Sequence, residues 1–317
     1  MIDIQTAERA VIVGGSGFIG SRLALALLNK GVDVTVLDIA PLPDDLTGRC
    51  SYVFCDIAHR ESLRGLFTGH TFVYLLAGVL AKGCRENALR AWRTNVVGIA
   101  NVLDALATDS PRARVIFSST GGVYAPQDTY PVTEHAPKCC HSLYSSSKLA
   151  AEGMVHSYTA TAGGSAIILR FFTVYGPGPA SGERGHFIAR WLECVREARP
   201  LTVHGEGDQT VDLTHITDVV RACLLASRSP VNTGQTQIYN IASGIETSVG
   251  VIARWIQERV PLTSIAFQPE MRGYGPQRQF GDISRARQDL GYIPQISPYE
   301  GLMALVSWHF KPGEHSA

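Results

Sequence analysis

The sequence predicts an α/β protein with a doubly wound parallel sheet, because strand-like apolar runs alternate with helical patterns along most of the chain. A glycine-rich turn, residues 14–20, separates the first strand-like run from the first helical one. Small and polar residues also recur where the predicted strands end. Because ligands bind at the carboxyl ends of the strands in such sheets, we expect the functional site there.

The predicted strands are short apolar runs, at 9–13, 32–37, 52–55, 72–76, 114–118, 166–170 and 237–241. The predicted helices have apolar residues three or four positions apart, and they cover 18–30, 60–67, 88–107, 144–161, 186–198 and 216–226. Helices between parallel strands supply the right-handed crossovers that such a sheet requires.

The glycine-rich turn has the spacing of a Rossmann-like dinucleotide-binding loop. Gly14 suits the tight turn, Gly17 the approach of a pyrophosphate, and Gly20 the close packing of helix on strand. The unpaired N–H groups that begin the helix, at Phe18 and Ile19, can bind the anion. An ordinary glycine-rich turn can have this spacing too, so its place between a strand and a helix is what favours a dinucleotide.

Asp38 follows the second predicted strand, at the position where a carboxylate can bind both ribose hydroxyls of an adenosine. A carboxylate there repels a 2′-phosphate, and the next residues, Ile39 and Ala40, provide no arginine to bind one. The alternative is an ordinary turn residue at a strand end. With the glycines, Asp38 favours NAD over NADP as the cofactor.

Tyr144 and Lys148 lie one helical turn apart, on one face of a predicted helix. An ammonium beside a phenol favours the phenolate, so such a pair can remove the proton of an alcohol. Ordinary surface pairs have the same spacing. The glycine turn and the preceding Ser118-Ser119-Thr120 segment favour a catalytic pair instead.

The composition argues against several other classes of function. The 28 basic and 28 acidic residues give no net charge, so nothing indicates binding to nucleic acid or to an anionic membrane. The seven cysteines have no paired metal-ligand spacing, and we expect reduced thiols and no metal. With no basic leader before the first strand and no apolar run of about 20 residues, a cytoplasmic protein is expected.

Taken in order, these motifs resemble those of the extended short-chain dehydrogenase/reductases, specifically the NAD-dependent nucleotide-sugar epimerase/dehydratase family. The resemblance covers nearly the whole chain. It is carried by the glycine turn, Asp38, Asp56-Ile57, Leu76-Ala77-Gly78, Asn95, Ser119-Thr120-Gly121-Gly122-Val123-Tyr124, Tyr144 with Lys148, Arg170-Phe171-Phe172-Thr173-Val174-Tyr175-Gly176-Pro177, and Asp282-Ile283-Ser284.

The resemblance assigns roles to individual residues. Tyr144 is the expected catalytic base, Lys148 holds the nicotinamide ribose and lowers the pKa of Tyr144, and Thr120 bonds the reacting sugar oxygen. The expected substrate contacts are Thr120, Thr173 and Arg272, with Arg278 less favoured. The expected NAD contacts are Gly14, Gly17, Phe18, Ile19, Gly20, Asp38, Asp56, Ile57, Leu76, Ala77, Gly78, Asn95, Ser118, Tyr144, Lys148 and Phe171.

The resemblance also divides the chain. Residues 1–171 are the expected NAD-binding Rossmann domain, to which 215–242 return, and residues 172–214 and 243–317 form a smaller C-terminal α/β region for the substrate. By analogy with related dimers, we expect a homodimer in which the helices at 88–107 and 144–161 pack against their copies.

The residues after Thr120 favour one reaction of this family. Dehydratases and decarboxylases that resemble the chain have acids there, whereas this chain has Gly121 and Gly122, as UDP-glucose 4-epimerase-like enzymes do. We therefore expect epimerisation of a UDP-hexose or UDP-hexuronate at C-4, through a keto intermediate. Two alternatives stay open: an NAD(P)H-dependent reductase of a keto-sugar nucleotide or other carbonyl compound, and a non-catalytic dinucleotide-sensing scaffold.

Three positions depart from relatives of this kind. Ala180 replaces an arginine that UDP-glucuronate 4-epimerases tend to carry, although 170–177 resembles their sequence. Thr173 stands where many epimerases have asparagine, and Val211 where relatives usually have an arginine that reaches the nucleotide. These departures leave the sugar and the nucleotide open.

Overall fold

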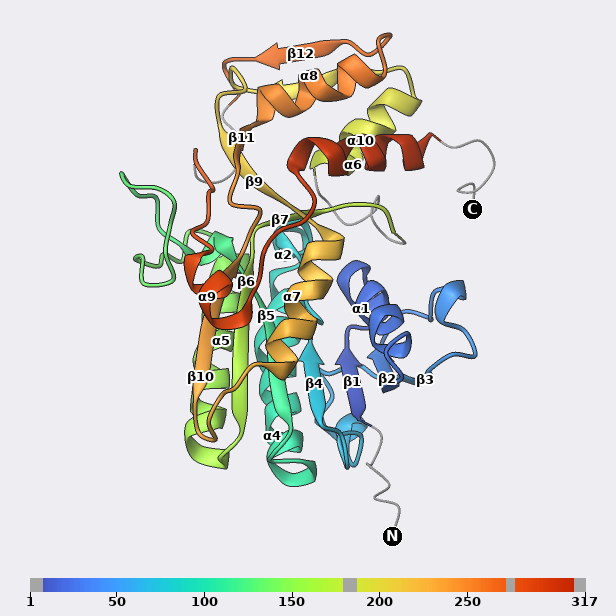
Figure 1. Ribbon diagram of the computed structural model, residues 1–317, viewed down its shortest axis with the longest axis vertical. Helices are drawn as coiled ribbons and strands as arrows, with labels where there is room; N and C mark the ends of the chain where they lie inside the picture. Colours follow the sequence, from blue (N-terminus) through green and yellow to red (C-terminus); the bar gives the residue numbers. More distant parts are fainter. Residues whose placement is uncertain (1–7, 179–186, 272–276, 311–317) are drawn as a thin grey trace.

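The computed structural model describes residues 8–178, 187–271 and 277–310. Its largest element is a seven-stranded parallel sheet in the order β10-β6-β5-β4-β1-β2-β3 (Figure 1). The strands are β1 (Arg9–Val13), β2 (Asp33–Asp38), β3 (Ser51–Phe54), β4 (Phe72–Leu75), β5 (Arg114–Thr120), β6 (Ser165–Phe171) and β10 (Thr236–Ile241). The strand order reverses between β1 and β4, which makes the sheet doubly wound and confirms the predicted Rossmann-like fold class.

Helices cover both faces of this sheet. Along β1, Ala10 and Ile12 pack into one apolar cluster and Val11 and Val13 into another, as the two-residue period of a strand requires. The first cluster lies under α1 (Phe18–Leu28) and α7 (Ile216–Arg228), and the second under α4 (Ile99–Asp109) and α5 (Leu143–Ala162). Burial on both faces explains why the strands have nearly continuous apolar sequences.

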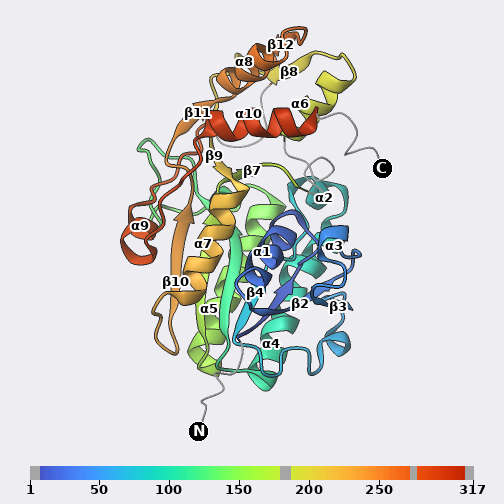
Figure 2. The same cartoon turned by 45° about the vertical axis from the view of Figure 1, so that its right-hand side comes forward.

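A smaller region stands over the carboxyl ends of the large sheet (Figures 1 and 2). Its three-stranded sheet has the order β11-β9-β7, and a two-stranded sheet pairs β12 with β8. Its elements are β7 (Thr173–Tyr175), α6 (Phe187–Arg196), β8 (Leu201–His204), β9 (Thr210–His215), β11 (Glu246–Ser248), α8 (Val249–Arg259), β12 (Ile265–Gln268) and α10 (Pro298–His309). The short α9 (Ser284–Leu290) contacts β10 instead.

The division of the chain near residue 171 stays a prediction, and two sheets meet at this position of the chain. Strand β6 ends in the large sheet at Phe171, and β7 begins the three-stranded sheet at Thr173. The chain later returns to the large sheet through α7 and β10.

The helix predicted at 60–67 is wrong. Residues Arg60–Leu63 form only a short 3₁₀ turn, η2, and Gly65 then adopts a left-handed conformation with φ of 72°. A left-handed residue ends a helix. The predicted helix at 88–107 is present as three successive segments: α3 (Ala88–Trp92), the π-helical η3 (Arg93–Gly98), and α4. Elements that the sequence did not predict include η1 (Asp44–Leu46), α2 (Ala81–Glu86) and η4 (Gly121–Val123).

Candidate active site

A cavity of about 1850 Å³ lies where the carboxyl edge of the large sheet meets the smaller region. Ordinary ligand pockets measure roughly 300–1,000 Å³, so this space suits two ligands side by side. Most of the residues predicted from the sequence line it: Gly14, Gly17, Phe18, Ile19, Gly20, Asp38, Asp56, Ile57, Leu76, Ala77, Gly78, Ser118, Thr120, Tyr144, Lys148, Phe171 and Thr173.

The glycine turn fits the pyrophosphate of a dinucleotide. Gly14 has a φ of 88°, and a Cβ placed on it would lie 2.5 Å from the backbone nitrogen of Ala77. A Cβ on Gly20 would lie 2.3 Å from the carbonyl oxygen of Gly14. The glycine turn places the start of α1 at the cavity wall. The first helical turn of α1 contains no acidic residue that would repel an anion.

The carboxylate of Asp38 is held in place at the end of β2. Its Oδ2 accepts a hydrogen bond from the Ser16 N–H at 2.9 Å, and its Oδ1 accepts one from the Ala40 N–H at 3.0 Å. Asp38 lines the cavity and keeps acceptor capacity for ribose hydroxyls. At the end of β3, Asp56 accepts a hydrogen bond from the Ala58 N–H at 2.9 Å.

Asn95 has a different place from the other predicted NAD contacts. It is buried in η3, where its Oδ1 accepts from the Val79 N–H at 2.7 Å and its Nδ2 donates to the Val79 carbonyl at 2.9 Å. The Nδ2 also donates to Ser147 Oγ at 3.0 Å. Asn95 therefore joins the loop after β4 to the segment of α5 between Tyr144 and Lys148, and its contact with NAD stays a prediction.

The start of α5 and the end of β5 bring Thr120, Tyr144 and Lys148 to the cavity. Ser142 caps α5 through a reciprocal pair of hydrogen bonds with Ser145, which puts Tyr144 in the first turn. The buried Lys148 Nζ donates to the Ser118 carbonyl at 2.9 Å and lies 5.0 Å from the centre of the Phe117 ring.

Desolvation dominates the titration of both members of the pair. It raises the pKa of Tyr144 to about 12, the Cys84 thiol acts in the same direction, and an interaction with the Thr120 hydroxyl opposes it. Burial lowers the pKa of Lys148 to about 8, against the opposing effects of Glu152 and Cys84. The lowering of the Tyr144 pKa by Lys148 stays a prediction, because the causes that act on Tyr144 here are desolvation, Cys84 and Thr120.

Gly121 and Gly122 follow Thr120 in η4, and an added Cβ would be more crowded at Gly121 than at Gly122. A Cβ on Gly121 would lie 3.0 to 3.1 Å from atoms of the Phe172 ring. The Gly122 N–H donates to Thr120 Oγ1 at 3.0 Å, and a Cβ on Gly122 would lie 3.3 Å from the same oxygen. A larger side chain at 121 would displace the Phe172 ring.

The smaller region lines its part of the cavity with apolar side chains, with Arg190 of α6, and with several neutral polar side chains. The neutral polar side chains include Thr173, Thr202, Gln209 and Thr210, with His204 beside them. Val211 also lines this part.

The two arginines expected near phosphate have different outcomes. Arg272 lies outside the described residues. Arg278 makes a forked pair with Glu246, at 2.6 and 2.7 Å, and its guanidinium lies 4.3 Å from the centre of the Tyr130 ring. Its planar donors are directed to a carboxylate within the chain, and Arg278 is absent from the described lining of the cavity.

The sequence model of the NAD dependent epimerase/dehydratase family matches residues 10–242. The chain belongs to this family. Its membership confirms the resemblance predicted from the sequence and the choice of NAD.

Individual relatives agree over nearly the whole chain. It is 29% identical to a UDP-N-acetyl-alpha-D-glucosaminuronate decarboxylase of Bacillus cytotoxicus, covering 95% of this chain and 97% of that one. A UDP-glucose 4-epimerase of Thermotoga maritima, solved with UDP-glucose, superposes with a TM-score of 0.87 at 25% identity, covering 95% and 98%. A UDP-glucuronic acid 4-epimerase of Bacillus cereus, solved with UDP-glucuronic acid and NAD, has a TM-score of 0.84 at 27% identity, with the same coverage.

The described residues have no feature typical of a membrane span or of a metal centre. Among residues 8–178, 187–271 and 277–310, no helix has the length and apolar character needed to cross a bilayer. Within the same residues, no three histidine, cysteine or acidic side chains gather as metal ligands would.

The sequence did not indicate two features near the site. Cys84 lies in α2, a helix that was not predicted. Nothing in the sequence therefore indicated its effect on the pKa values of Tyr144 and Lys148. Phe172 was part of a recognised segment, but its contact with Gly121 joins residues about 50 positions apart and depends on tertiary packing.

Proposed function

We propose that the protein is an NAD-dependent 4-epimerase of a nucleotide sugar, of the UDP-hexose or UDP-hexuronate type. The supporting observation is that glycines follow Thr120, and that a Cβ on Gly121 would lie 3.0 to 3.1 Å from the Phe172 ring, so an acidic side chain there would have to displace the ring. Water elimination and decarboxylation use an acid in that segment in relatives that resemble this chain, and epimerisation does not need one. The acids that line the described part of the cavity are Asp38, Asp56 and Glu86.

We assign those three acids to roles other than water elimination or decarboxylation. Asp38 ends β2 and Asp56 follows β3, both on the adenosine side of the predicted cofactor site, and Glu86 pairs with Lys82 at 3.7 Å. Two solved relatives contain UDP-glucose and UDP-glucuronic acid, respectively. A cavity of this size can hold such a molecule, which supports a UDP-sugar as the ligand.

The geometry supports a separate chemical role for each of three side chains: Tyr144, Thr120 and Lys148. Bound NAD supplies the hydride acceptor and, in its oxidised form, a positive ring that favours the phenolate of Tyr144. Tyr144 removes the proton of the C-4 hydroxyl and later returns it. Thr120 Oγ1 accepts from the Gly122 N–H, which fixes its hydroxyl near Tyr144, and its proton can be donated to the Tyr144 phenolate or to the sugar oxygen. Lys148 holds positive charge beside Tyr144, fixed by the Ser118 carbonyl.

After oxidation, the keto sugar must turn its other face to the cofactor before the hydride returns. Threonine, glutamine and histidine side chains line the smaller region's part of the cavity together with Arg190 of α6, the arginine of that part of the described lining. The nucleotide end then supplies most of the binding energy.

We further propose that the protein works as a homodimer in the cytoplasm. Trp92, at the end of α3, is 39% exposed and lies outside the described lining of the cavity, and an exposed apolar side chain at this place supports a contact between subunits. Sedimentation equilibrium tests this, and a monomer at micromolar concentration would reject the dimer.

The decisive experiment incubates the purified protein with UDP-glucose, UDP-galactose, UDP-glucuronate and UDP-galacturonate and then identifies the products. We expect interconversion of a pair of C-4 epimers, no release of CO₂, and no net consumption of added NADH. Denaturation after dialysis should release about one NAD per chain. Decarboxylation of the uronate would establish a decarboxylase instead, and NADH consumption with a keto sugar would establish a reductase.

A further inference from the structure

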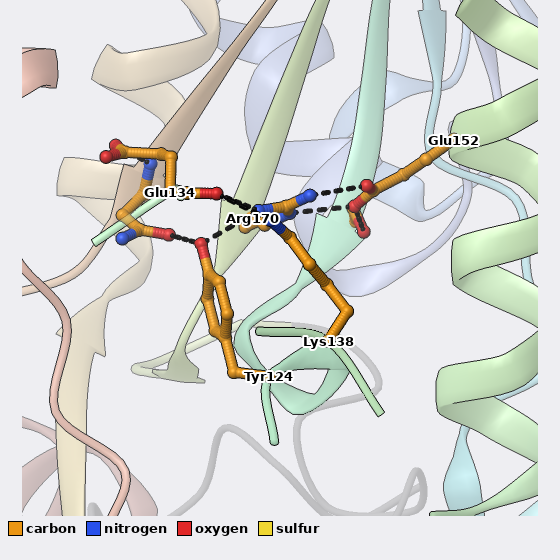
Figure 3. Close-up of polar contacts among 7 residues, drawn as sticks. Tyr124, Glu134, Lys138, Glu152 and Arg170 are labelled. Atoms are coloured by element: carbon orange, nitrogen blue, oxygen red, sulfur yellow. Dashed lines mark hydrogen bonds and ion pairs between the residues drawn. The ribbon is translucent and has the colours of Figure 1, made fainter. Parts of the chain in front are cut away.

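A buried ion pair lies directly behind the site. Arg170 of β6 and Glu152 of α5 are 2% and 5% exposed. The guanidinium meets the carboxylate in a fork, with Nε to Oε1 at 2.9 Å and Nη2 to Oε2 at 2.6 Å (Figure 3). Neither residue belongs to the described lining of the cavity. Because burying two charges is costly, such a pair is a weak source of net stability, and a functional reason for it is worth seeking.

The Arg170 guanidinium also donates hydrogen bonds to the segment that connects β5 to α5. Its Nη1 donates to the Tyr124 hydroxyl at 2.9 Å and to the Glu134 carbonyl at 3.1 Å. Lys138 Nζ donates to the same carbonyl at 2.9 Å. Figure 3 shows Arg170 between Glu152 on one side and Tyr124 and Glu134 on the other. This connection runs from Thr120 to Tyr144, so Arg170 fixes the segment that sets their separation.

Glu152 also anchors α5 to the end of β5. Ser119 Oγ donates to Glu152 Oε1 at 2.5 Å, and the neighbouring Ser118 carbonyl accepts from Lys148 Nζ at 2.9 Å. Lys148 and Glu152 are one helical turn apart on α5, on the face that also carries Tyr144. Two consecutive residues of β5 therefore hold two successive turns of the catalytic helix.

We propose that Glu152, locked by Arg170, is a positioning residue that keeps Lys148 charged and seated against the end of β5. The proposal rests on the proposed function only in assuming that Tyr144 and Lys148 act on a sugar hydroxyl. Glu152 does not contact substrate in this role; it acts through Lys148 and Ser119.

The charges around Lys148 are consistent with this role. Glu152 on its own helix and Cys84 from α2 both favour the charged ammonium, while burial opposes it and lowers the pKa of Lys148 to about 8. Arg170 from β6 and Lys138 from the β5–α5 connection are the cations that face Glu152, and Glu134 faces Arg170 and Lys138. Removing the Glu152 charge therefore removes an anion that supports the Lys148 ammonium.

The test compares Glu152→Gln with the double variant Glu152→Gln/Arg170→Gln. The amide retains an acceptor for Ser119, and the double variant avoids a buried arginine without its partner, which would be costly to fold. The chain has five lysines, at 30, 82, 138, 148 and 311, so ¹³C labelling of lysine side chains gives a simple spectrum in which Lys148→Arg identifies the Lys148 signal.

We expect the titration midpoint of Lys148 to fall most in Glu152→Gln, and less in the double variant because that variant also removes the Arg170 cation, with the alkaline limb of kcat moving down accordingly. At neutral pH, kcat should fall by roughly tenfold or more, while KM changes by less than about twofold, because the interaction supports the reacting groups and not the nucleotide. In Glu152→Asp, which keeps the negative charge, the titration midpoint of Lys148 should fall by less than in Glu152→Gln. An unchanged Lys148 midpoint in both glutamine variants would overturn the proposal.

A matched control removes a buried charge elsewhere. Asp218 of α7 is buried, pairs with Arg221 at 2.9 Å, and accepts from the Gln295 and Ile296 N–H groups. Asp218→Asn should lower stability without moving the Lys148 midpoint; a similar movement there would show that general destabilisation is the cause and would reject the role of Glu152. If the parent protein converts no nucleotide sugar, the proposed function fails, but the Lys148 titration still decides this inference.

Discussion

Lys148 donates a hydrogen bond from its Nζ to the backbone carbonyl of Ser118 at 2.9 Å. The contact joins the helix that carries Tyr144 to the strand that ends at Thr120, and so it brings together three side chains from two segments. It also satisfies one donor of a buried ammonium, which is otherwise expensive to desolvate. The predictions below follow from this arrangement and from the cavity around it.

Removal of the Tyr144 hydroxyl should abolish turnover without emptying the cofactor site. Tyr144→Phe keeps the ring in the cavity wall but removes the group that takes the proton, and losses of about 10²- to 10⁴-fold in kcat are typical for such a change. The measurements are kcat and the amount of NAD released on denaturation. Activity within tenfold of the parent would show that Tyr144 is not the base.

Lys148 should make the stability of the parent protein rise with pH in the alkaline range. Its pKa in the folded chain is about 8, below the ordinary 10.5, so the unfolded chain binds more protons between these values. The free energy of unfolding then increases with pH across this window, by at most about 3 kcal/mol.

Urea unfolding at pH 7 and at pH 10 measures this effect. The parent should gain stability relative to Lys148→Met, which has no titrating ammonium, as the pH rises. A constant difference between the two proteins would contradict the burial effect on Lys148.

An acid placed directly after Thr120 should destabilise the fold. Gly121→Asp puts its Cβ about 3 Å from the Phe172 ring, and overpacking of this kind typically costs about 1–3 kcal/mol. Urea unfolding gives the size of the effect, and product analysis should show no new decarboxylation. Gly153→Ala is the control, because a Cβ on Gly153 of α5 meets nothing within 4 Å. Equal stability of the Gly121→Asp variant and the parent would refute the packing argument.

Asp38 should determine the preference for NAD. Asp38→Ala removes the acceptor for the ribose hydroxyls and the charge that repels a 2′-phosphate, so NAD should bind about tenfold more weakly and the preference over NADP should shrink. Titration calorimetry with both dinucleotides measures this. Asp33→Asn, on the same strand but paired with Arg9, is the matched control and should leave both affinities unchanged. An unaltered NAD to NADP ratio in Asp38→Ala would exclude Asp38 from this role.

Local sequence patterns were sufficient to predict the large sheet and to choose residues most of which line one cavity. The seven strands are buried on both faces, so each reads as an apolar run, and the glycine turn depends on residues within one loop. Periodicity failed at 60–67, since it does not register that Gly65 adopts a left-handed conformation. It also missed β7 and β11, which have only three residues each and form by pairing with β9.

By itself the sequence determined the doubly wound sheet, the glycine turn that ends at Gly20, and the one-turn spacing of Tyr144 and Lys148, because each depends on residues close together in the chain. Only the tertiary structure decided that Arg170 joins Glu152 to the segment containing Tyr124. It also decided that desolvation governs the titration of Tyr144 and Lys148. Burial and long-range hydrogen bonds depend on how distant segments pack, and no local spacing encodes that packing.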